Sequence, residues 1–134
     1  MNKLINFFDF NFIKFFFLIF LIATVFNVHG KTVKVKIIHV IDGDTVIART
    51  VKNSKMKIRL IGIDAPEKNQ QHGKDSKKYL DQLISSKIVS VLISNKDKYR
   101  RHLGTIFIGK INVNLELVKS GNAWAYRKYL KKMN

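Results

Sequence analysis

The sequence predicts a mainly β fold with helices (α+β), built as a five-stranded barrel of the OB type over residues 31–134. Three observations predict it. Alternating apolar and basic residues mark a first and a third strand with β-rich sequence between them, a helical apolar stripe follows, and two more strands come after the helix. Five strands with a helix between the third and the fourth is the order of an OB barrel. A chain of 134 residues has room for one such domain.

The first three strands are predicted from alternation and turn residues. Apolar and basic residues alternate from Thr32 to Ile41, which indicates a half-buried strand. Asp42-Gly43 interrupts the pattern before β-rich sequence resumes from Thr45 to Thr50, and Asp-Gly between two such runs favours a hairpin. A third alternating run starts at Met56 and is expected to continue until Ala65-Pro66, because proline lacks the ladder donor.

The second half of the domain changes period twice. Ser76 to Ser85 carries one apolar stripe at helical spacing. Two strands are expected next, over Ile88 to Ser94 and Gly104 to Ile108. Asn112 is suited to cap a short helix that Gly121 ends, and short helical sequence is expected to continue toward the C-terminus.

The charge balance indicates a polyanionic partner. Lys and Arg number 25 against 9 Asp and Glu, a net charge of +16, and the part from Lys31 onward keeps +15. Such an excess suits nucleic acid or an anionic membrane surface. Cysteine is absent, so no disulfide, thiolate nucleophile or Cys-bound zinc is possible.

Residues 1–30 resemble a signal peptide. Lys3 and Lys14 precede an uncharged run of 12 residues, Phe15 to Phe26, which is short for a spanning helix and typical of a signal core. Val28 and Gly30 are small enough to precede a cleavage site. We therefore expect an exported, secreted or periplasmic protein. The alternative is an uncleaved membrane anchor facing outward, in which case residues 1–30 are the only membrane contact.

Four of the acidic residues fall at two strand ends. Asp42 and Asp44 occupy the first turn, and Asp64 and Glu67 flank Pro66. If barrel curvature brings the two ends together, the carboxylates repel one another and a hard cation relieves the repulsion. Calcium suits loosely held oxygen ligands better than magnesium does. By itself, the Asp-Gly-Asp segment favours only a hairpin turn.

Two arginine positions complete a possible phosphodiesterase. Arg59 lies five residues before Asp64, and Arg101 follows Arg100 in a polar loop. Either arginine can be an ordinary solvated charge, or a guanidinium that grips a phosphate in bidentate fashion. Phosphodiester hydrolysis needs a cation, a base that orients water, and donors for the charged oxygens. The composition allows this set without singling it out.

Four segments together resemble the thermonuclease (staphylococcal nuclease-like) family in order and spacing. They are Ile41-Asp42-Gly43-Asp44-Thr45, Arg59-Leu60-Ile61-Gly62-Ile63-Asp64-Ala65-Pro66-Glu67, Asp97-Lys98-Tyr99-Arg100-Arg101 and Val113-Asn114-Leu115-Glu116-Leu117-Val118. The resemblance runs from about Val35 to Tyr129. Each segment is weak alone, and four in register are highly specific.

The resemblance implies a calcium-dependent nuclease that cleaves DNA and RNA with low sequence preference, leaves 3′-phosphate ends and acts as a monomer. Its site residues are then assigned by motif. Asp44, Asp64 and the backbone carbonyl of Ala65 would bind Ca²⁺, Glu67 would act on the attacking water, Arg59 and Arg101 would clamp the phosphate, and Asp42 would hold the turn. The alternative from another class is a non-catalytic nucleic-acid-binding OB domain.

The chain departs from the family in two places. Arg100 stands where the family usually has glycine, and the domain is C-terminally short at Asn134. Tyr99 and Tyr126 are expected to contact the nucleotide, since OB surfaces stack bases on aromatic rings. Trp124 is expected in the core.

Overall fold

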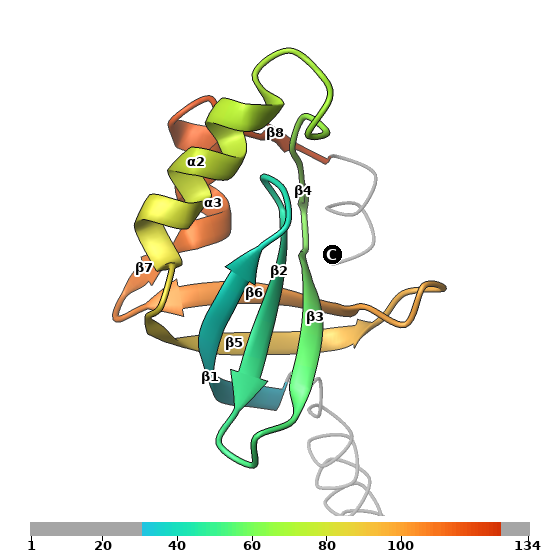
Figure 1. The fold of residues 1–134 in the computed structure, drawn as a ribbon, viewed down its shortest axis with the longest axis vertical. Helices are drawn as coiled ribbons and strands as arrows, with labels where there is room; N and C mark the ends of the chain where they lie inside the picture. The colour runs from blue at the N-terminus through green and yellow to red at the C-terminus, as the bar shows by residue number, and fades with distance from the viewer. Residues whose placement is uncertain (1–30, 127–134) are drawn as a thin grey trace, which may run out of the picture.

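Five long strands close into a barrel in the computed structural model, which describes residues 31–126 (Figure 1). The barrel strands are β1 (Lys31–Val40), β2 (Thr45–Thr50), β3 (Lys55–Leu60), β5 (Ile88–Lys96) and β6 (His102–Ile108). Neighbours pair antiparallel in the order β3-β2-β1-β5-β6, and the parallel pairing of β3 with β6 closes the barrel. The predicted five-stranded α+β barrel is confirmed.

The first turn forms as the Asp-Gly signal predicts. Val40 pairs with Val46 across the β1–β2 hairpin, and the Ile41 amide donates to the Thr45 carbonyl at 2.9 Å. Gly43 is buried at this turn. A Cβ at this position would lie 2.7 Å from Ala65 Cβ and 1.9 Å from Ser76 Oγ, so a larger residue would clash. The absence of a side chain thus lets the turn pack beneath the segment that follows β3.

The third strand ends earlier than predicted. β3 stops at Leu60, and the chain bends through Gly62, whose φ of +77° is in the left-handed region that favours glycine. The Ile61 amide donates to the Gly104 carbonyl at 3.0 Å at this bend. The chain then forms the short strand β4 (Ile63–Asp64), which leaves the barrel. The sequence marks this break as a shift of the apolar positions from Met56, Ile58 and Leu60 to Ile61, Ile63 and Ala65, which the prediction did not take into account.

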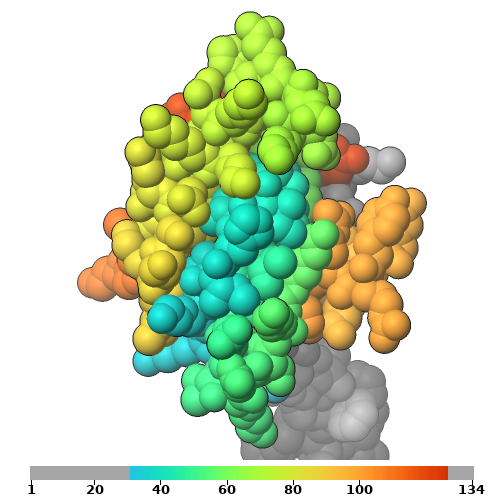
Figure 2. All heavy atoms as spheres, in the orientation of Figure 1, coloured from blue at the N-terminus to red at the C-terminus, as the bar shows by residue number. Residues whose placement is uncertain are grey.

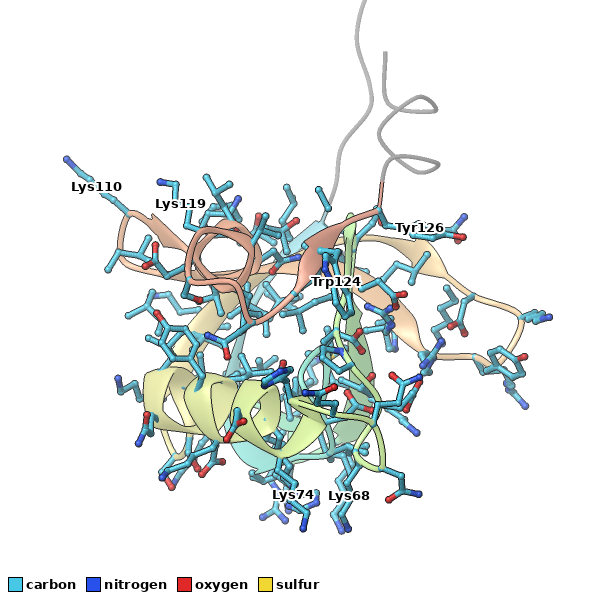
Figure 3. All side chains as sticks on the ribbon, turned by 90° about the horizontal axis from the view of Figure 1, so that it is seen from above. Lys68, Lys74, Lys110, Lys119, Trp124 and Tyr126 are labelled. Carbon is cyan, nitrogen blue, oxygen red and sulfur yellow. The ribbon has the colours of Figure 1, made fainter. Side chains whose placement is uncertain are left out.

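β4 pairs with β8 (Trp124–Ala125) in a separate two-stranded ribbon. Trp124 lies opposite Asp64 in this ribbon and is 64% exposed, so the expectation that it is a core residue is wrong (Figure 3). The physical reason is that the ribbon stands outside the barrel, apart from the core that the barrel and helices enclose within residues 31–126. The Tyr126 amide donates to the Gly62 carbonyl at 2.9 Å, which ties the end of the ribbon to the bend.

Two helices cover one end of the barrel, α2 (Gly73–Ile84) and α3 (Val113–Lys119), the latter following the short strand β7 (Ile111–Asn112) (Figures 1 and 2). α2 begins three residues before the predicted Ser76, in polar sequence that carries no apolar signal. The Asn112 cap is confirmed, since its Oδ1 accepts from the Leu115 amide at 3.1 Å. Gly121, at φ +74°, follows the end of α3 as expected.

The core lies between the barrel interior and these helices. Leu80 and Ile84 of α2 and Leu117 of α3 are fully buried. The strands contribute these buried apolar residues to it: Val35, Ile37, Val46, Ala48, Ile58, Leu60, Val89, Val91 and Ile106.

The predicted signal or anchor segment, residues 1–30, lies outside the described residues, as do Tyr129 and the short helical sequence expected at the C-terminus. Within residues 31–126, no helix has the length and apolar character needed to cross a membrane.

Candidate functional site

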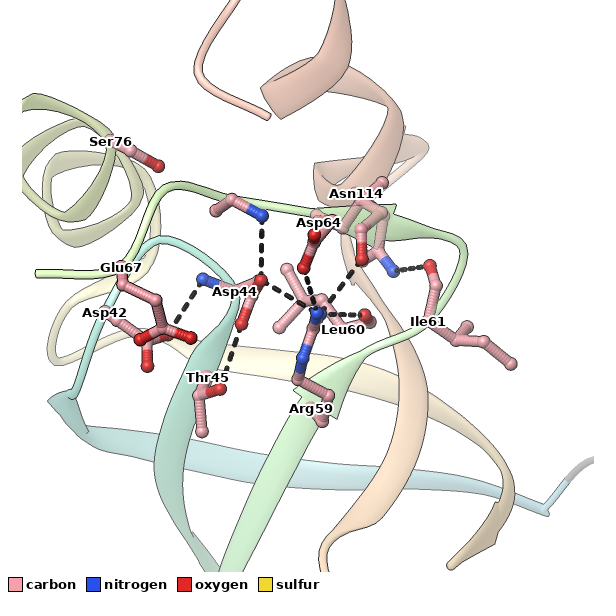
Figure 4. A network of polar contacts seen from close by, with 12 residues as sticks. Asp42, Asp44, Thr45, Arg59, Leu60, Ile61, Asp64, Glu67, Ser76 and Asn114 are labelled. Atoms are coloured by element: carbon pink, nitrogen blue, oxygen red, sulfur yellow. Dashed lines mark hydrogen bonds and ion pairs between the residues drawn. The ribbon is translucent and has the colours of Figure 1, made fainter. Parts of the chain in front are cut away.

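Arg59 occupies the end of β3 and joins the two acidic strand ends. Its Nη2 lies 3.0 Å from Asp44 Oδ2 and 2.9 Å from Asp64 Oδ1 (Figure 4). Its Nη1 donates to the backbone carbonyls of Leu60 at 2.8 Å and Ile63 at 3.0 Å. The guanidinium is thereby fixed in the bend between β3 and β4, with 17% of the side chain exposed. It is not the freely solvated charge that the sequence also allowed.

The barrel brings the first turn against the segment after β3. The Leu60 amide donates to the Asp44 carbonyl at 2.8 Å, and the Ala65 amide donates to Asp44 Oδ2 at 2.9 Å. The second bond joins positions 21 residues apart in the chain. Both bonds exist because β2 and β3 are antiparallel neighbours, with Thr45 opposite Arg59. The question that the sequence left open is therefore settled: the two ends meet.

Asp44 is a buried carboxylate with a perturbed pKa. Its side chain is 8% exposed, and Thr45 Oγ1 donates to its Oδ1 at 3.0 Å. Burial raises the pKa of Asp44 from 3.8 to about 6, although the Arg59 charge and the Ala65 amide both oppose the rise. The positive charge now beside Asp44 therefore does not fully offset its desolvation, and a further cation would stabilise the ionised form.

Asp42 supports the turn. Its Oδ1 accepts from the Asp44 amide at 3.1 Å, which is the bond expected of a residue that holds this turn. Glu67 is exposed, and its carboxylate makes no hydrogen bond or ion pair with other residues in 31–126. Its backbone is fixed instead, since the Glu67 amide donates to Gln70 Oε1 at 2.7 Å and its carbonyl accepts from the Gln70 amide at 2.8 Å. The Glu67 side chain is thus an available base on an anchored backbone.

The donors at this site suit a hard cation. Asp44, Asp64 and the Ala65 carbonyl offer only oxygen, which is the ligand type of calcium. Within the described part of the chain, no three Asp, Glu or His side chains converge closely enough to hold a metal by themselves. The guanidinium of Arg59 lies between the two carboxylates. A cation held here must therefore share these carboxylates with Arg59 and draw on backbone oxygen.

Arg101 is oriented by Asp97, a residue whose role the sequence analysis missed. Arg101 Nε donates to Asp97 Oδ2 at 2.7 Å, and the Arg101 amide donates to Asp97 Oδ1 at 2.9 Å. Partial burial opposes ionisation of Asp97, but these bonds prevail and lower its pKa. The i to i+4 spacing of acid and base in a turn is the signal that could have found this pair.

Arg100 has an unusual backbone at the same turn. Its φ is +63°, in the left-handed region, and its amide donates to the Asp97 carbonyl at 2.9 Å. This conformation favours glycine, which gives a physical reason for the glycine usual at this position in the family. Arg100 is exposed and does not line the cavity described next.

A cavity of about 220 Å³ collects most of the expected phosphate-binding groups. Arg59, Asp64, Arg101 and Tyr126 line it, together with Asp97, Leu103 and the bend from Leu60 to Ile63. Asp44 lies behind Arg59 rather than in the wall. Tyr99 and Glu67 are outside the lining, and the Tyr99 ring packs on Arg101 with its centroid 5.4 Å from Cζ.

Asn114 is a second residue to which the sequence analysis gave no role of its own. It is buried in α3, where Nδ2 donates to the carbonyls of Ile61 at 2.9 Å and Gly104 at 3.2 Å, and Oδ1 accepts from the Ile106 amide at 3.1 Å. It thereby fixes the bend that carries Arg59 and Asp64. A polar residue on the apolar side of a predicted helix was the available signal.

Comparisons with known proteins identify relatives of this chain. The sequence profile of the family described as "Staphylococcal nuclease homologue" matches residues 57–134. An "Uncharacterized endonuclease" of Haemophilus influenzae is 45% identical over 94 residues, which are 70% of this chain and 53% of that protein. An "Uncharacterized endonuclease" of Escherichia coli O157:H7 is 36% identical over 104 residues, 77% of this chain and 64% of the relative.

A "Probable staphylococcal-like nuclease" of Oryza sativa subsp. japonica is 36% identical over 89 residues, 66% of this chain and 23% of that protein. The chain thus spans between about half and two thirds of the length of the bacterial relatives, and a smaller share of the plant one.

Proposed function

This chain belongs to the staphylococcal nuclease homologue family, and on that premise we propose that it is a nuclease that hydrolyses phosphodiester bonds of DNA and RNA with calcium as cofactor. One observation carries the proposal. Arg59 bridges the buried Asp44 and the exposed Asp64 at the wall of a cavity that Arg101 also lines. The site therefore offers two guanidinium groups to a phosphate and oxygen ligands to a cation.

The proposed division of labour follows the chemistry of each group. Asp44, Asp64 and the Ala65 carbonyl would hold Ca²⁺, and the bound ion would place positive charge beside the phosphate and lower the pKa of a nearby water. Arg59 would then share its two carboxylate partners with the ion, and part of its guanidinium would be available to the substrate.

The clamp and the base act on different oxygens of the phosphate. Arg59 and Arg101 donate to the oxygens on which negative charge builds up, and they do so from fixed positions because the bend and Asp97 hold them. Glu67 orients or deprotonates the attacking water. Tyr99 and Tyr126 contact the nucleotide, and cleavage leaves a 3′-phosphate. Sequence preference is low, because contacts with phosphate carry no base information.

The rival function is a non-catalytic nucleic-acid-binding domain. A domain that only binds phosphate gains nothing from carboxylates beside the phosphate site, since they repel the ligand. Asp44 and Asp64 both lie within 3.0 Å of Arg59, the residue proposed to donate hydrogen bonds to the phosphate. This arrangement favours the catalytic function. We further propose that the protein is exported, and that it is secreted or periplasmic unless residues 1–30 anchor it, and that it acts as a monomer.

Digestion assays with the full chain test the proposal. Plasmid DNA and RNA are incubated with calcium or with chelator, and the product ends are tested for 3′-phosphate by labelling before and after phosphatase. We expect cleavage of both substrates with calcium and none in chelator. Full activity in chelator would refute the role of calcium. Binding without cleavage under every metal condition would support the alternative, a non-catalytic nucleic-acid-binding domain.

A further inference from the structure

The outer face of the β1–β3 meander carries charge of one sign. Five exposed basic residues project from it, and we call them the basic track: Lys34, Lys36, Arg49, Lys55 and Lys57. No acidic residue lies between positions 31 and 41 or between positions 45 and 63. This face of the barrel, coloured cyan to green, is turned toward the viewer in Figure 2. The track is therefore an uncompensated positive surface.

Strand register places three of these charges side by side. Lys36 pairs with Arg49 across β1 and β2, and Arg49 pairs with Lys55 across β2 and β3. Like charges directly opposite one another destabilise a sheet by some tenths of a kcal/mol per pair. A row of three basic residues with no acidic neighbour on these strands thus lowers the stability of the fold slightly. An anionic ligand bound to the row would offset this repulsion.

The rest of the surface shows that a general excess of lysine does not explain the track. The exposed side of α2 has Lys74 and Lys78 interspersed with Asp75 and Asp81. Acidic residues thus occur on the helix and in the turns of the described chain, but none lies on the outer face of the three consecutive strands β1, β2 and β3.

The track leads to the candidate site. Lys55, Lys57 and Arg59 are spaced two apart on β3, so they share one face of the strand and lie about 7 Å from one to the next. Arg59 is the residue that bridges Asp44 and Asp64. A row of positive charge therefore runs from the far end of β3 to the proposed catalytic arginine without interruption by an acidic residue.

We propose that the basic track binds the phosphate backbone of a polynucleotide substrate beyond the cleaved phosphate. The inference rests on the proposed function and adds a property to it: the enzyme holds several nucleotides along β3 and prefers long substrates to short ones. Lysine-rich contacts of this kind are electrostatic and independent of sequence. An anionic membrane is the other polyanion that a basic surface can meet, and the alignment with Arg59 favours nucleic acid.

A charge-matched pair of variants tests the track. The track variant changes the three registered residues together, Lys36→Gln, Arg49→Gln and Lys55→Gln. The control variant removes the same charge from exposed positions on the helices and the β6–β7 turn: Lys78→Gln, Lys110→Gln and Lys119→Gln (Lys110 and Lys119 in Figure 3). None of the six residues belongs to the proposed catalytic machinery. The track variant should unfold at a temperature no lower than the wild type, because it loses like-charge repulsion.

Binding is measured in chelator with the full chain and a fluorescent oligothymidylate of about 20 nucleotides, longer than the usual site of one OB fold. Each lost phosphate contact lowers the salt slope for single strands by about 0.7, so the slope of log K against log salt should become shallower by about 2 in the track variant. The control variant should keep the wild-type slope. Equal losses in both variants would show that net charge alone acts, and would overturn the track.

Two further measurements separate the possible failures. With calcium, the track variant should lose kcat/KM on the long oligonucleotide but not on a dinucleotide with a single phosphodiester bond. If the wild type cleaves neither substrate, the proposed catalysis fails, and the salt slopes still decide the track. Vesicles of phosphatidylserine and of phosphatidylcholine form the membrane arm: loss of anionic-vesicle binding in the track variant with an unchanged oligonucleotide slope would refute the nucleic-acid assignment.

Discussion

Replacement of Asp44 by asparagine should stabilise the protein while abolishing its activity. Burial raises the pKa of Asp44 from 3.8 to about 6, so the folded state holds the proton more tightly than the unfolded state. Between pH 4 and 6 the folded protein thus binds more protons, and its free energy of unfolding falls as pH rises. At about 1.4 kcal/mol per pH unit, this loss in the free energy of unfolding reaches about 3 kcal/mol at pH 6 and stays constant at higher pH.

The asparagine side chain fits the same contacts. Its carbonyl oxygen can replace Oδ2 and accept from the Ala65 amide and from Arg59, while its amide faces Thr45 Oγ1, which can turn its hydroxyl to accept. Asp44→Asn therefore removes the ionisation while both polar atoms of the new side chain keep a partner. The variant should match the wild type near pH 4 and exceed it by up to about 3 kcal/mol at pH 7.

Urea unfolding of both proteins across pH 4 to 8 in chelator measures this difference. Taking the difference between the proteins cancels the titration of all other groups, including Asp97, whose lowered pKa contributes the opposite slope in acid. Asp81→Asn, an exposed change of equal charge on α2, serves as the control and should follow the wild type. Calcium should raise the stability of the wild type and act much less on the variant, because only the wild type keeps the full ligand set.

A variant that is less stable than the wild type at pH 7 would refute the reasoning. That result would mean that the attraction between Arg59 and the ionised Asp44 outweighs the cost of burying the carboxylate. Asp44 would then be a structural partner of Arg59, and the case for a cation at this site would rest on Asp64 and the backbone alone.

Four other predictions concern single positions. Arg101→Lys should lower turnover on the order of 100-fold or more, since a fixed donor to the charged oxygens is lost. Arg100→Gly should leave turnover unchanged and raise the free energy of unfolding by about 1 kcal/mol or less, because it relieves a positive φ. If Arg100→Gly lowers turnover and Arg101→Lys does not, the clamp belongs to Arg100. Glu67→Gln should lower turnover with calorimetric calcium affinity changed less, and a variant as fast as the wild type would remove Glu67 from the mechanism. Gly43→Ala should destabilise the protein by about 1–3 kcal/mol in urea, as its Cβ meets Ala65 and Ser76; unchanged stability would mean that the turn has room to move. Mass spectrometry of the exported protein should find Lys31 as its first residue, and an intact Met1 in the membrane fraction would establish the anchor instead.

Much of the site could be predicted from sequence, but only as a set of residue types. Asp44, Arg59, Asp64 and Arg101 were identifiable through four motifs in register, and the structure brings them together around one bend. The role of Asp97 was missed, because an acidic residue in a polar loop usually faces solvent and only its i to i+4 spacing from Arg101 indicates the pair. The role of Asn114 was missed because it joins three segments: its partners in β6 are 8 and 10 residues away, and the Ile61 carbonyl in the bend is 53 residues away.

The sequence by itself determined the elements of this protein. Alternation with period two indicated β1 and β3, β-rich sequence indicated β2, Asp-Gly placed the hairpin, and Asn112 capped α3, because each of these depends on residues that are close together in the chain. Its charge of +16 was likewise fixed by composition.

Only the tertiary structure decided which of those elements meet. The parallel pairing of β3 with β6 closes the barrel, and the bend at Gly62 sends β4 out to pair with β8, so that Trp124 is exposed opposite Asp64. The burial that perturbs Asp44 and the bridging position of Arg59 both follow from this closure. The physical reason is that desolvation and ion pairing depend on distance in space, and the spacing of residues along the chain does not fix that distance.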